Sequence, residues 1–228
     1  MIPPGARLLD VGTDHAYLPI ALLQSGVVEA AIGADVRSGP LAQARVHARS
    51  AGVLDRLDLR QGDGLKVVTP GEVSVAVLAG MGGRLMLRLL QQAPDVVAAL
   101  ERLVLAPNTH PAEVRRWART QGFDFVAEDL VQEGRHLYPI LCLAPGGVLP
   151  MAAAAEQQTP LTDVEAELGP LLLRQGHPLV LEAARRLAAA ARHKLRGLER
   201  GGGEAAAVER RRLEQWEEVV RCWPKWPI

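Results

Sequence analysis

The chain has 228 residues, with 26 Lys and Arg against 26 Asp and Glu, so its formal net charge is zero. This balance excludes a protein that binds polyanions through its overall charge, and any nucleic-acid surface must be a local patch. No apolar run approaches the ~20 residues of a membrane span, and residues 1–5 do not resemble a signal peptide. Cys142 and Cys222 lack metal-ligand spacing. We expect a cytoplasmic protein with no membrane segment and no metal.

The first predicted element is a strand–turn–helix at residues 8–19, with the sequence LLDVGTDHAYLP. The apolar strand ends at Asp10 and Gly12, and Pro19 lies in the first turn of the helix. Such a unit commonly begins a nucleotide-binding α/β domain. The dinucleotide fingerprint G-x-G-x-x-G is absent, and Asp14 and His15 occupy the turn instead. This favours a cationic ligand such as S-adenosylmethionine (SAM) and disfavours a nicotinamide-dependent oxidoreductase.

Strands and helices alternate along the next hundred residues. Further strands are predicted at residues 29–35, 57–61, 73–79 and 103–106. Helices are predicted at residues 38–51, 84–92 and 111–121, the first with Ser38 as its cap and Pro40 at its first position. A closing antiparallel hairpin is predicted at residues 123–130 and 137–143. The alternation predicts an α/β fold with a mostly parallel, doubly wound sheet.

The composition changes beyond residue 147. Residues 152–222 are rich in Ala, Leu, Arg and Glu and contain no convincing strand. Helical periodicity covers residues 179–198 and 205–220, and three glycines at 201–203 separate the two segments. This pattern predicts a helical hairpin or short coiled coil. We therefore expect two domains, at residues 1–147 and 148–228.

Small or acidic residues follow the predicted strands, at the edge where open α/β sheets bind ligands. Asp35 lies 23 residues after Gly12, close to the spacing of an acid that holds ribose hydroxyls. Asp63 is placed to accept a hydrogen bond from an adenine amino group. Gly12, Gly80 and Gly82 permit close approach of the backbone to a ligand. Each acid taken alone is more often a helix cap or loop residue, so the inference depends on the strand ends together.

Five short motifs resemble the TrmK family of bacterial tRNA adenine-N1 methyltransferases, which act on position 22 in the D-arm. They are LLDVGTDHAYLP at 8–19, GP at 39–40, GDGL at 62–65, AGMGG at 79–83 and APN at 106–108. The resemblance covers about residues 7–143, and the helical tail is similar to the C-terminal coiled coil of that family. It implies a Rossmann-like, SAM-dependent methyltransferase sheet of seven strands, the last two forming an antiparallel hairpin.

The same resemblance implies which residues hold SAM. Asp10 and Gly12 would line the methionine end, and Asp35 would hold the ribose. Asp63 and Gly64 would border the adenine. The AGMGG turn adds its three central residues to the cofactor site: Gly80, Met81 and Gly82.

Four residues are candidates for the substrate side. Adenine N1 carries a lone pair and no proton, so the base gains positive charge as it accepts a methyl group. Asp14 is the candidate that stabilises this charge and helps remove the N6 proton; the alternative is a helix cap or a cofactor contact. His15 either orients the base or contacts phosphate, or is structural, and Tyr17 either stacks on a flipped base or packs in the core. Asn108 matches the Asn of an Asn-Pro-Pro-aromatic motif in related enzymes, although here the order is Pro-Asn.

Contact with RNA is expected from local basic patches. Residues 181–212 contain nine Arg or Lys against four acids, a pattern that fits phosphate contacts or a solvated helical face. A second candidate patch is Arg115, Arg116 and Arg119. We expect tRNA as the partner and a monomer as the working form.

The chain departs from the family at its start, because the family carries a helical segment before the first strand, which here begins by about Arg7. We expect the loss of that segment to remove a lid over the cofactor, and this is the ground for the second of two alternatives. One is a methyltransferase with another substrate. A requirement for folded tRNA in methyl transfer would distinguish the main interpretation from this alternative. The other is a SAM-binding or RNA-binding protein without turnover, which predicts cofactor affinity alone.

Overall fold

The computed structural model describes residues 1–147, 159–198 and 203–225 of the chain. The chain divides into two compact units. The first contains Met1–Ala127 and Pro139–Pro160, and the second contains Glu128–Tyr138 and Leu161–Ile228. The expected division at residue 147 does not anticipate that the segment Glu128–Tyr138 groups with the C-terminal helices.

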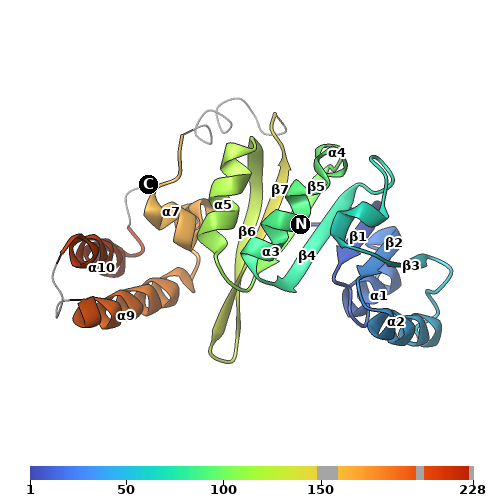
Figure 1. The fold of residues 1–228 in the computed structure, drawn as a ribbon, viewed down its shortest axis with the longest axis horizontal. Helices are drawn as coiled ribbons and strands as arrows, with labels where there is room; N and C mark the ends of the chain where they lie inside the picture. The colour runs from blue at the N-terminus through green and yellow to red at the C-terminus, as the bar shows by residue number, and fades with distance from the viewer. Residues whose placement is uncertain (148–158, 199–202, 226–228) are drawn as a thin grey trace. The chain divides into compact units, whose positions relative to one another are not determined.

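The protein contains a seven-stranded mixed sheet in the order β3-β2-β1-β4-β5-β7-β6 (Figure 1). Strands β1 to β5 pair in parallel, and β7 runs antiparallel to β5. The strands are β1 Ala6–Val11, β2 Val28–Asp35, β3 Leu57–Gln61, β4 Val75–Met81, β5 Arg102–Pro107, β6 Phe123–Glu133 and β7 His136–Pro145. The seven strands and the closing hairpin confirm the sheet expected from the sequence.

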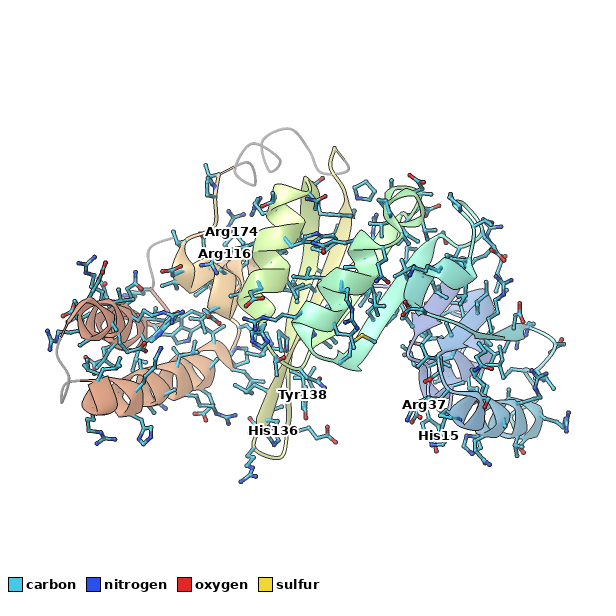
Figure 2. The ribbon with its side chains drawn as sticks, in the orientation of Figure 1. His15, Arg37, Arg116, His136, Tyr138 and Arg174 are labelled. Carbon is cyan, nitrogen blue, oxygen red and sulfur yellow. The ribbon has the colours of Figure 1, made fainter. Side chains whose placement is uncertain are left out.

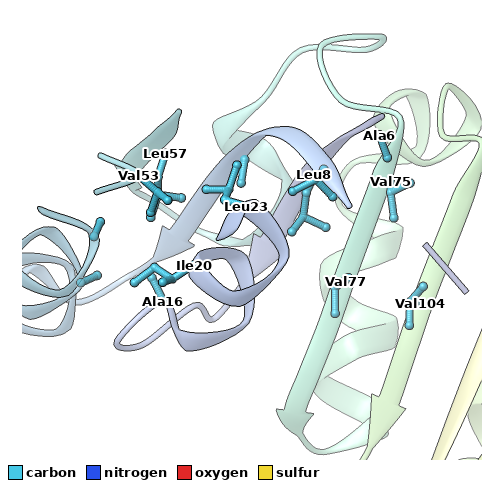
Figure 3. Packing of buried hydrophobic residues seen from close by; sticks show 14 of the residues in the cluster. Ala6, Leu8, Ala16, Ile20, Leu23, Val53, Leu57, Val75, Val77 and Val104 are labelled. Carbon is cyan, nitrogen blue, oxygen red and sulfur yellow. The ribbon is translucent and has the colours of Figure 1, made fainter. Parts of the chain in front are cut away.

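The order of the strands reverses at β1. The chain builds outward from β1 to β2 and β3, and then returns to place β4 on the other side of β1. Such a reversal opens a crevice at the carboxyl ends of the two strands, where doubly wound folds bind ligands. Leu8 and Val75 are aligned across β1 and β4 and share a core with Ile20 and Leu23 of α1 (Tyr17–Gln24) (Figure 3). This buried core fixes the positions of the strand ends above it.

The helices of the first unit follow the strands, as predicted. They are α2 Ser38–Ser50, the 3-10 helix η1 Gly64–Val67, α3 Gly83–Gln91, α4 Pro94–Ala98 and α5 Pro111–Thr120. Ser38 begins α2 rather than capping it, because Arg37 occupies the cap position in extended conformation. Pro40 is therefore the third helical residue, still in the first turn, where a missing N–H is tolerated. The five-residue α4 was not predicted, since so short a segment shows no periodicity.

The described part of the second unit includes α7 Asp163–Leu168, α8 Pro170–Arg174, α9 Val180–Leu198 and α10 Glu204–Cys222. The two long helices match the predicted ones, and Gly201 and Gly202 between them lie outside the described residues. Small side chains of α9, such as Ala184 and Ala188, share a core with Trp216 of α10. The helical region is thus confirmed, and a coiled coil stays a prediction. None of the described helices has the length and apolar character needed to cross a lipid bilayer.

Candidate functional site

A cavity of about 350 Å³ lies at the carboxyl ends of β1, β2 and β4. This volume is typical of a small-molecule site. Asp10 and Gly82 do not line it, because Asp10 is buried within β1 and Gly82 occupies the cap position of α3. The other six predicted cofactor residues do line it: Gly12, Asp35, Asp63, Gly64, Gly80 and Met81.

Two glycines shape the cavity through their backbone conformation. Gly12 has a φ of 74° and Gly80 a φ of 71°, in the left-handed region that glycine adopts readily. A Cβ built on Gly12 would meet Met81 Cε at 3.1 Å, whereas a Cβ on Gly80 would meet nothing within 4 Å. Because Gly80 lines the cavity, a side chain at this position would take up space that a ligand needs.

Asp35 places a buried carboxylate in the cavity wall at the end of β2. Its Oδ1 accepts hydrogen bonds from the backbone N–H of Arg37 at 2.9 Å and from Arg37 Nε at 3.4 Å. Among the described residues nothing donates to its second oxygen, Oδ2. That oxygen is therefore available to accept hydrogen bonds from a vicinal diol.

Asp63 is the cap residue of η1, just after β3, and Gly64 is the first residue of η1. The Asp63 side chain is about half exposed, and its Oδ2 lies 3.3 Å from Lys66 Nζ. Gly64 has a φ of 62°, and a Cβ there would approach Leu89 Cδ2 to 2.8 Å. The turn thus presents a solvated acid at the cavity edge and leaves no room for a side chain beside it.

Arg60 holds the loop that follows this turn. Its guanidinium donates to Asp58 Oδ2 at 2.8 Å, to the Val67 carbonyl at 2.8 Å and to Glu72 Oε1 at 2.5 Å. The Glu72 carboxylate also accepts from the backbone N–H of Thr69. These bonds lower the pKa of Glu72 to about 2, with the Arg60 hydrogen bond as the largest cause. Arg60 therefore fixes residues 67–72, which begin at the end of η1, from outside the cavity.

Replacing Arg60 with Lys is expected to lower the free energy of unfolding by about 1–2 kcal/mol, because an ammonium group cannot reproduce the fixed fork of donors. Glu72 has a folded-state pKa below its unfolded value of 4.5, so its contribution is present above that pH and lost as the pH falls towards about 2. Urea unfolding at neutral pH and near pH ~3 measures the free energy of unfolding of both proteins. The difference in this free energy between the variant and the parent should be smaller at the lower pH.

Arg56→Lys is the matched control, since Arg56 is exposed and lies on the loop just before β3. An equal loss of stability in Arg56→Lys and Arg60→Lys would contradict the role of Arg60.

Asp10 is the buried acid behind the cavity. It lies on β1, aligned with Gly33 of β2 and Val77 of β4, and is only 6% exposed. Burial raises the pKa of its carboxyl from the ordinary 3.8 to about 6. At neutral pH Asp10 is therefore mostly ionised, and its desolvated negative charge favours a cation in its neighbourhood.

Asp10→Asn is expected to stabilise the folded protein at neutral pH. The folded-state pKa lies above the unfolded one, so ionisation of Asp10 opposes folding, and stability falls as the pH rises from about 4 to about 6. The variant should gain up to about 3 kcal/mol at pH ~7.5 and nothing from this source below pH ~4. Thermal unfolding of both proteins across this range measures the gain, and a difference that does not vary with pH would contradict it.

Asp14, His15 and Tyr17 lie on the turn between β1 and α1, which we call the 13–17 turn. Asp14 Oδ1 lies 3.5 Å from Arg37 Nη2, and Asp14 Oδ2 lies 3.6 Å from His15 Nε2. Figure 2 shows His15 and Arg37 close together beside this turn. Arg37 also lines the cavity, so it links the turn to the predicted cofactor site.

The structure removes two of the alternative roles on this turn. The cap residue of α1 is Ala16, and no side chain caps that helix, so Asp14 is not a helix cap. Tyr17 is 68% exposed, so it does not pack in the core. Both side chains are accessible to a substrate.

Asn108 follows the end of β5. Its backbone N–H donates to the Met81 carbonyl at 2.9 Å, which fixes it beside a residue of the cavity wall. The residue is exposed. The structure thus brings Asn108 to the rim of the cavity without a described contact to Asp14.

Two residues of this region, Arg37 and His47, are not among those predicted from the sequence. Arg37 bridges Asp35 and Asp14, and its position two residues after a strand-ending acid was an available signal. His47, from α2, stacks its ring on Tyr17 with centroids 5.3 Å apart and an interplanar angle of 22°. No sequence signal marks His47, because its contacts depend on how α2 packs beside α1.

The second predicted basic patch is wrong. Arg115 is fully buried in α5, and Arg116 is exposed. The Arg119 guanidinium lies over the Phe125 ring, 5.1 Å from its centroid. These three arginines therefore do not form one phosphate-binding surface.

Seven basic residues of α9 and α10 fall into two groups. One group is paired with acids: Arg186 with Glu182 at 2.7 Å, Arg192 with Glu217 at 2.5 Å, Lys194 with Glu209 at 2.7 Å and Arg212 with Glu167 at 3.7 Å. Arg185, Arg196 and Arg211 are exposed and form no ion pair within the described part of the chain. Arg200 lies outside the described residues. Fewer basic side chains are therefore available to contact phosphates than the nine Arg and Lys counted in residues 181–212.

The reversal of the sheet at β1 and the acid-lined cavity beside it define a Rossmann-like methyltransferase. In agreement, a family model described as a methyltransferase domain matches residues 1–141. The chain is 34% identical over 145 residues to the curated tRNA (adenine(22)-N(1))-methyltransferase of Bacillus subtilis. That match covers 64% of this chain and 61% of the relative, so the alignment spans less than two thirds of the curated protein.

Two solved structures extend the similarity over 96% of the chain. A candidate tRNA (m1A22) methyltransferase of Streptococcus pneumoniae is 31% identical, with a TM-score of 0.86 over 96% of this chain and 95% of that one. The same protein in complex with S-adenosyl-L-methionine gives a TM-score of 0.83 over 96% and 94%, respectively. The chain belongs to the TrmK family of methyltransferases.

The residues of the cavity fit SAM. Asp35 offers a free carboxylate oxygen for the ribose diol, and the solvated Asp63 offers an acceptor for the adenine amino group. The space beside Gly80 is open to a ligand. The buried charge of Asp10 suits a ligand with a cationic end. In the parts of the chain that the structure describes, no group of three or more His, Cys, Asp or Glu could hold a metal ion.

Proposed function

We propose that the protein transfers a methyl group from SAM to N1 of the adenine at position 22 in the D-arm of tRNA. The observation that carries this proposal is the acid-lined cavity joined by Arg37 to the exposed 13–17 turn. A cofactor site beside exposed Asp, His and Tyr side chains suits an enzyme whose substrate arrives from solvent. The named relatives support adenine 22 of tRNA as the target.

SAM, when bound, supplies an electrophilic methyl group on a sulfonium. Asp35 accepts hydrogen bonds from the ribose, and Asp63 with Gly64 borders the adenine. Asp10 favours the cationic methionine end through its buried charge. The turn residues Gly12, Gly80 and Met81 complete the cofactor site, and Gly82 precedes α3 beside them.

The 13–17 turn receives the target base. The lone pair of adenine N1 would form the bond to the methyl carbon as the methyl–sulfur bond breaks, with S-adenosylhomocysteine as the neutral leaving group. The base would then carry the positive charge, and the Asp14 carboxylate would stabilise it. Asp14 then helps to remove a proton from N6. The exposed ring of Tyr17 stacks on the flipped base, His15 orients it, and Asn108 meets it at the rim of the cavity.

We further propose that residues 148–228 contact the tRNA. The exposed and unpaired Arg185, Arg196 and Arg211 are the best placed to meet phosphates. Since tRNA is found in the cytoplasm, the protein acts there, and we propose that it acts as a monomer.

Arg185→Gln is expected to weaken tRNA binding and to reduce the slope of log affinity against log salt by about 1. Arg192→Gln is the matched control on the same helix, because Arg192 is already paired with Glu217. Binding titrations at several salt concentrations measure both slopes. Equal slopes for Arg185→Gln and the parent would exclude Arg185 from the RNA surface.

Incubation with labelled SAM tests the reaction itself. The substrates are a folded tRNA transcript, the same transcript unfolded by mutation of its D-arm stem, free adenosine and a mixture of proteins. The proposal predicts label in the folded transcript alone. Equal labelling of adenosine or protein would point to another substrate, and SAM binding without any label would indicate a protein without turnover.

A further inference from the structure

The 13–17 turn has an unusual backbone. Asp14 has a φ of 49° and Ala16 a φ of 58°, so two residues other than glycine adopt the left-handed region within three positions. Such conformations persist only where the surroundings hold them in place. The cap position of α1 falls on Ala16 and receives no side-chain hydrogen bond. Backbone hydrogen bonds hold the two ends of the turn, from the Thr13 N–H to the Ala34 carbonyl at 2.9 Å and from the Ala16 N–H to the Thr13 carbonyl at 2.7 Å. The His15 peptide, between the two left-handed residues, needs a contact of its own.

His47, in the last turn of α2, makes contacts that meet this need. Its Nδ1 lies 3.3 Å from the backbone carbonyl oxygen of His15. A carbonyl only accepts, so this contact is a hydrogen bond when the His47 proton is on Nδ1. The same imidazole stacks on the Tyr17 ring at 5.3 Å and lies 5.6 Å from the His15 ring.

We propose that His47 is a positioning residue for methyl transfer, which holds the 13–17 turn and supports the ring of Tyr17. The inference rests on the proposed function, because it concerns the turn that receives the base. His47 holds the turn by its backbone at His15, between the two left-handed residues. It also covers one face of the Tyr17 ring and leaves the 68% exposed phenol free to meet a base on the other.

His47 does not line the cofactor cavity, so its loss should affect the substrate side alone. A side chain that acts through Asp14 and Tyr17 changes kcat and the KM for tRNA, and it leaves the affinity for SAM unchanged. A side chain that merely stabilises the fold would lower all three together. This separation distinguishes a positioning role from a structural one.

Three variants divide the two contacts. His47→Asn keeps a donor near the position of Nδ1 and loses the ring, so the KM for tRNA should rise while kcat is largely kept. His47→Phe keeps the ring and loses the donor, so kcat should fall. His47→Ala loses both, and kcat/KM should fall by about tenfold to a hundredfold, as for other misplaced reacting groups. The affinity for SAM, measured by calorimetry, should differ from that of the parent by no more than about twofold in all three variants.

Val46→Ala is the control, because Val46 is the preceding, exposed residue of α2 and contributes no donor or ring. Parent-like kcat and KM in His47→Ala would overturn the proposal, and so would a parallel loss of SAM affinity. Amide hydrogen exchange of residues 14–18 gives a readout without substrate, and it should speed up in His47→Ala and in His47→Phe but not in Val46→Ala. If the parent does not methylate tRNA, the proposed function fails, while the exchange rates still decide whether His47 holds the turn.

Discussion

Asp14→Asn is expected to lower kcat by about 10²–10³-fold while leaving the affinity for SAM within roughly a factor of two. In the proposed reaction the Asp14 carboxylate stabilises the positive charge that the base gains in the transition state, and a neutral amide cannot do so. Asn is the suitable replacement because it tolerates the left-handed conformation in which Asp14 is held. Single-turnover methylation and calorimetric SAM binding measure the two quantities.

The control for Asp14→Asn is Asp55→Asn, which removes an exposed acid elsewhere in the first unit. Parallel loss of kcat and SAM affinity in Asp14→Asn would move this residue into the cofactor site. Such an outcome is physically reasonable, because Arg37 contacts both Asp14 and the cofactor-site residue Asp35.

Asp35→Asn is expected to weaken SAM binding by about 10- to 100-fold, the range for losing charge-assisted hydrogen bonds. In the proposed cofactor site the free Oδ2 of Asp35 accepts a hydrogen bond from the ribose, and the amide of Asn replaces one acceptor with a donor. The substitution also leaves the Arg37 guanidinium beside a neutral group. Calorimetric titration with SAM and with S-adenosylhomocysteine measures the loss.

A 2′-deoxyribose analogue of S-adenosylhomocysteine isolates the ribose contact. The parent should bind this analogue more weakly than S-adenosylhomocysteine itself, whereas Asp35→Asn should distinguish the two much less. If the variant still prefers the intact ribose as strongly as the parent does, Asp35 does not hold the diol.

Local sequence patterns predicted the sheet and its ligand-binding edge because both depend on short-range information. Buried strands appear as apolar runs, and the turns after them need glycine or a short acid. The spacing between Gly12 and Asp35 follows from one strand–helix–strand unit, so two residues far apart in the sequence were correctly brought to one cavity. The predicted cap at Ser38 failed by one residue, as helix ends commonly do.

Features that depend on tertiary packing were not predictable in the same way. The sequence predicts a surface position for Arg115, because arginine is mostly exposed, yet α5 buries it completely. The contact of His47 with His15 and Tyr17 joins segments 30 residues or more apart and exists only once α1 and α2 have packed. The pairing of Arg192 and Lys194 with acids of α10 likewise cannot be seen from charge counts along the chain.

The most direct test of the central claim is to locate the methyl group on tRNA. The protein is incubated with SAM and a transcript carrying adenine at position 22, and N1-methyladenine is located by the stop it causes in reverse transcription and by mass spectrometry of nuclease fragments. We expect one modified site at adenine 22 and no modification of a transcript with guanine at that position. Methylation that persists in the guanine transcript, or that falls elsewhere in the adenine transcript, would contradict the account.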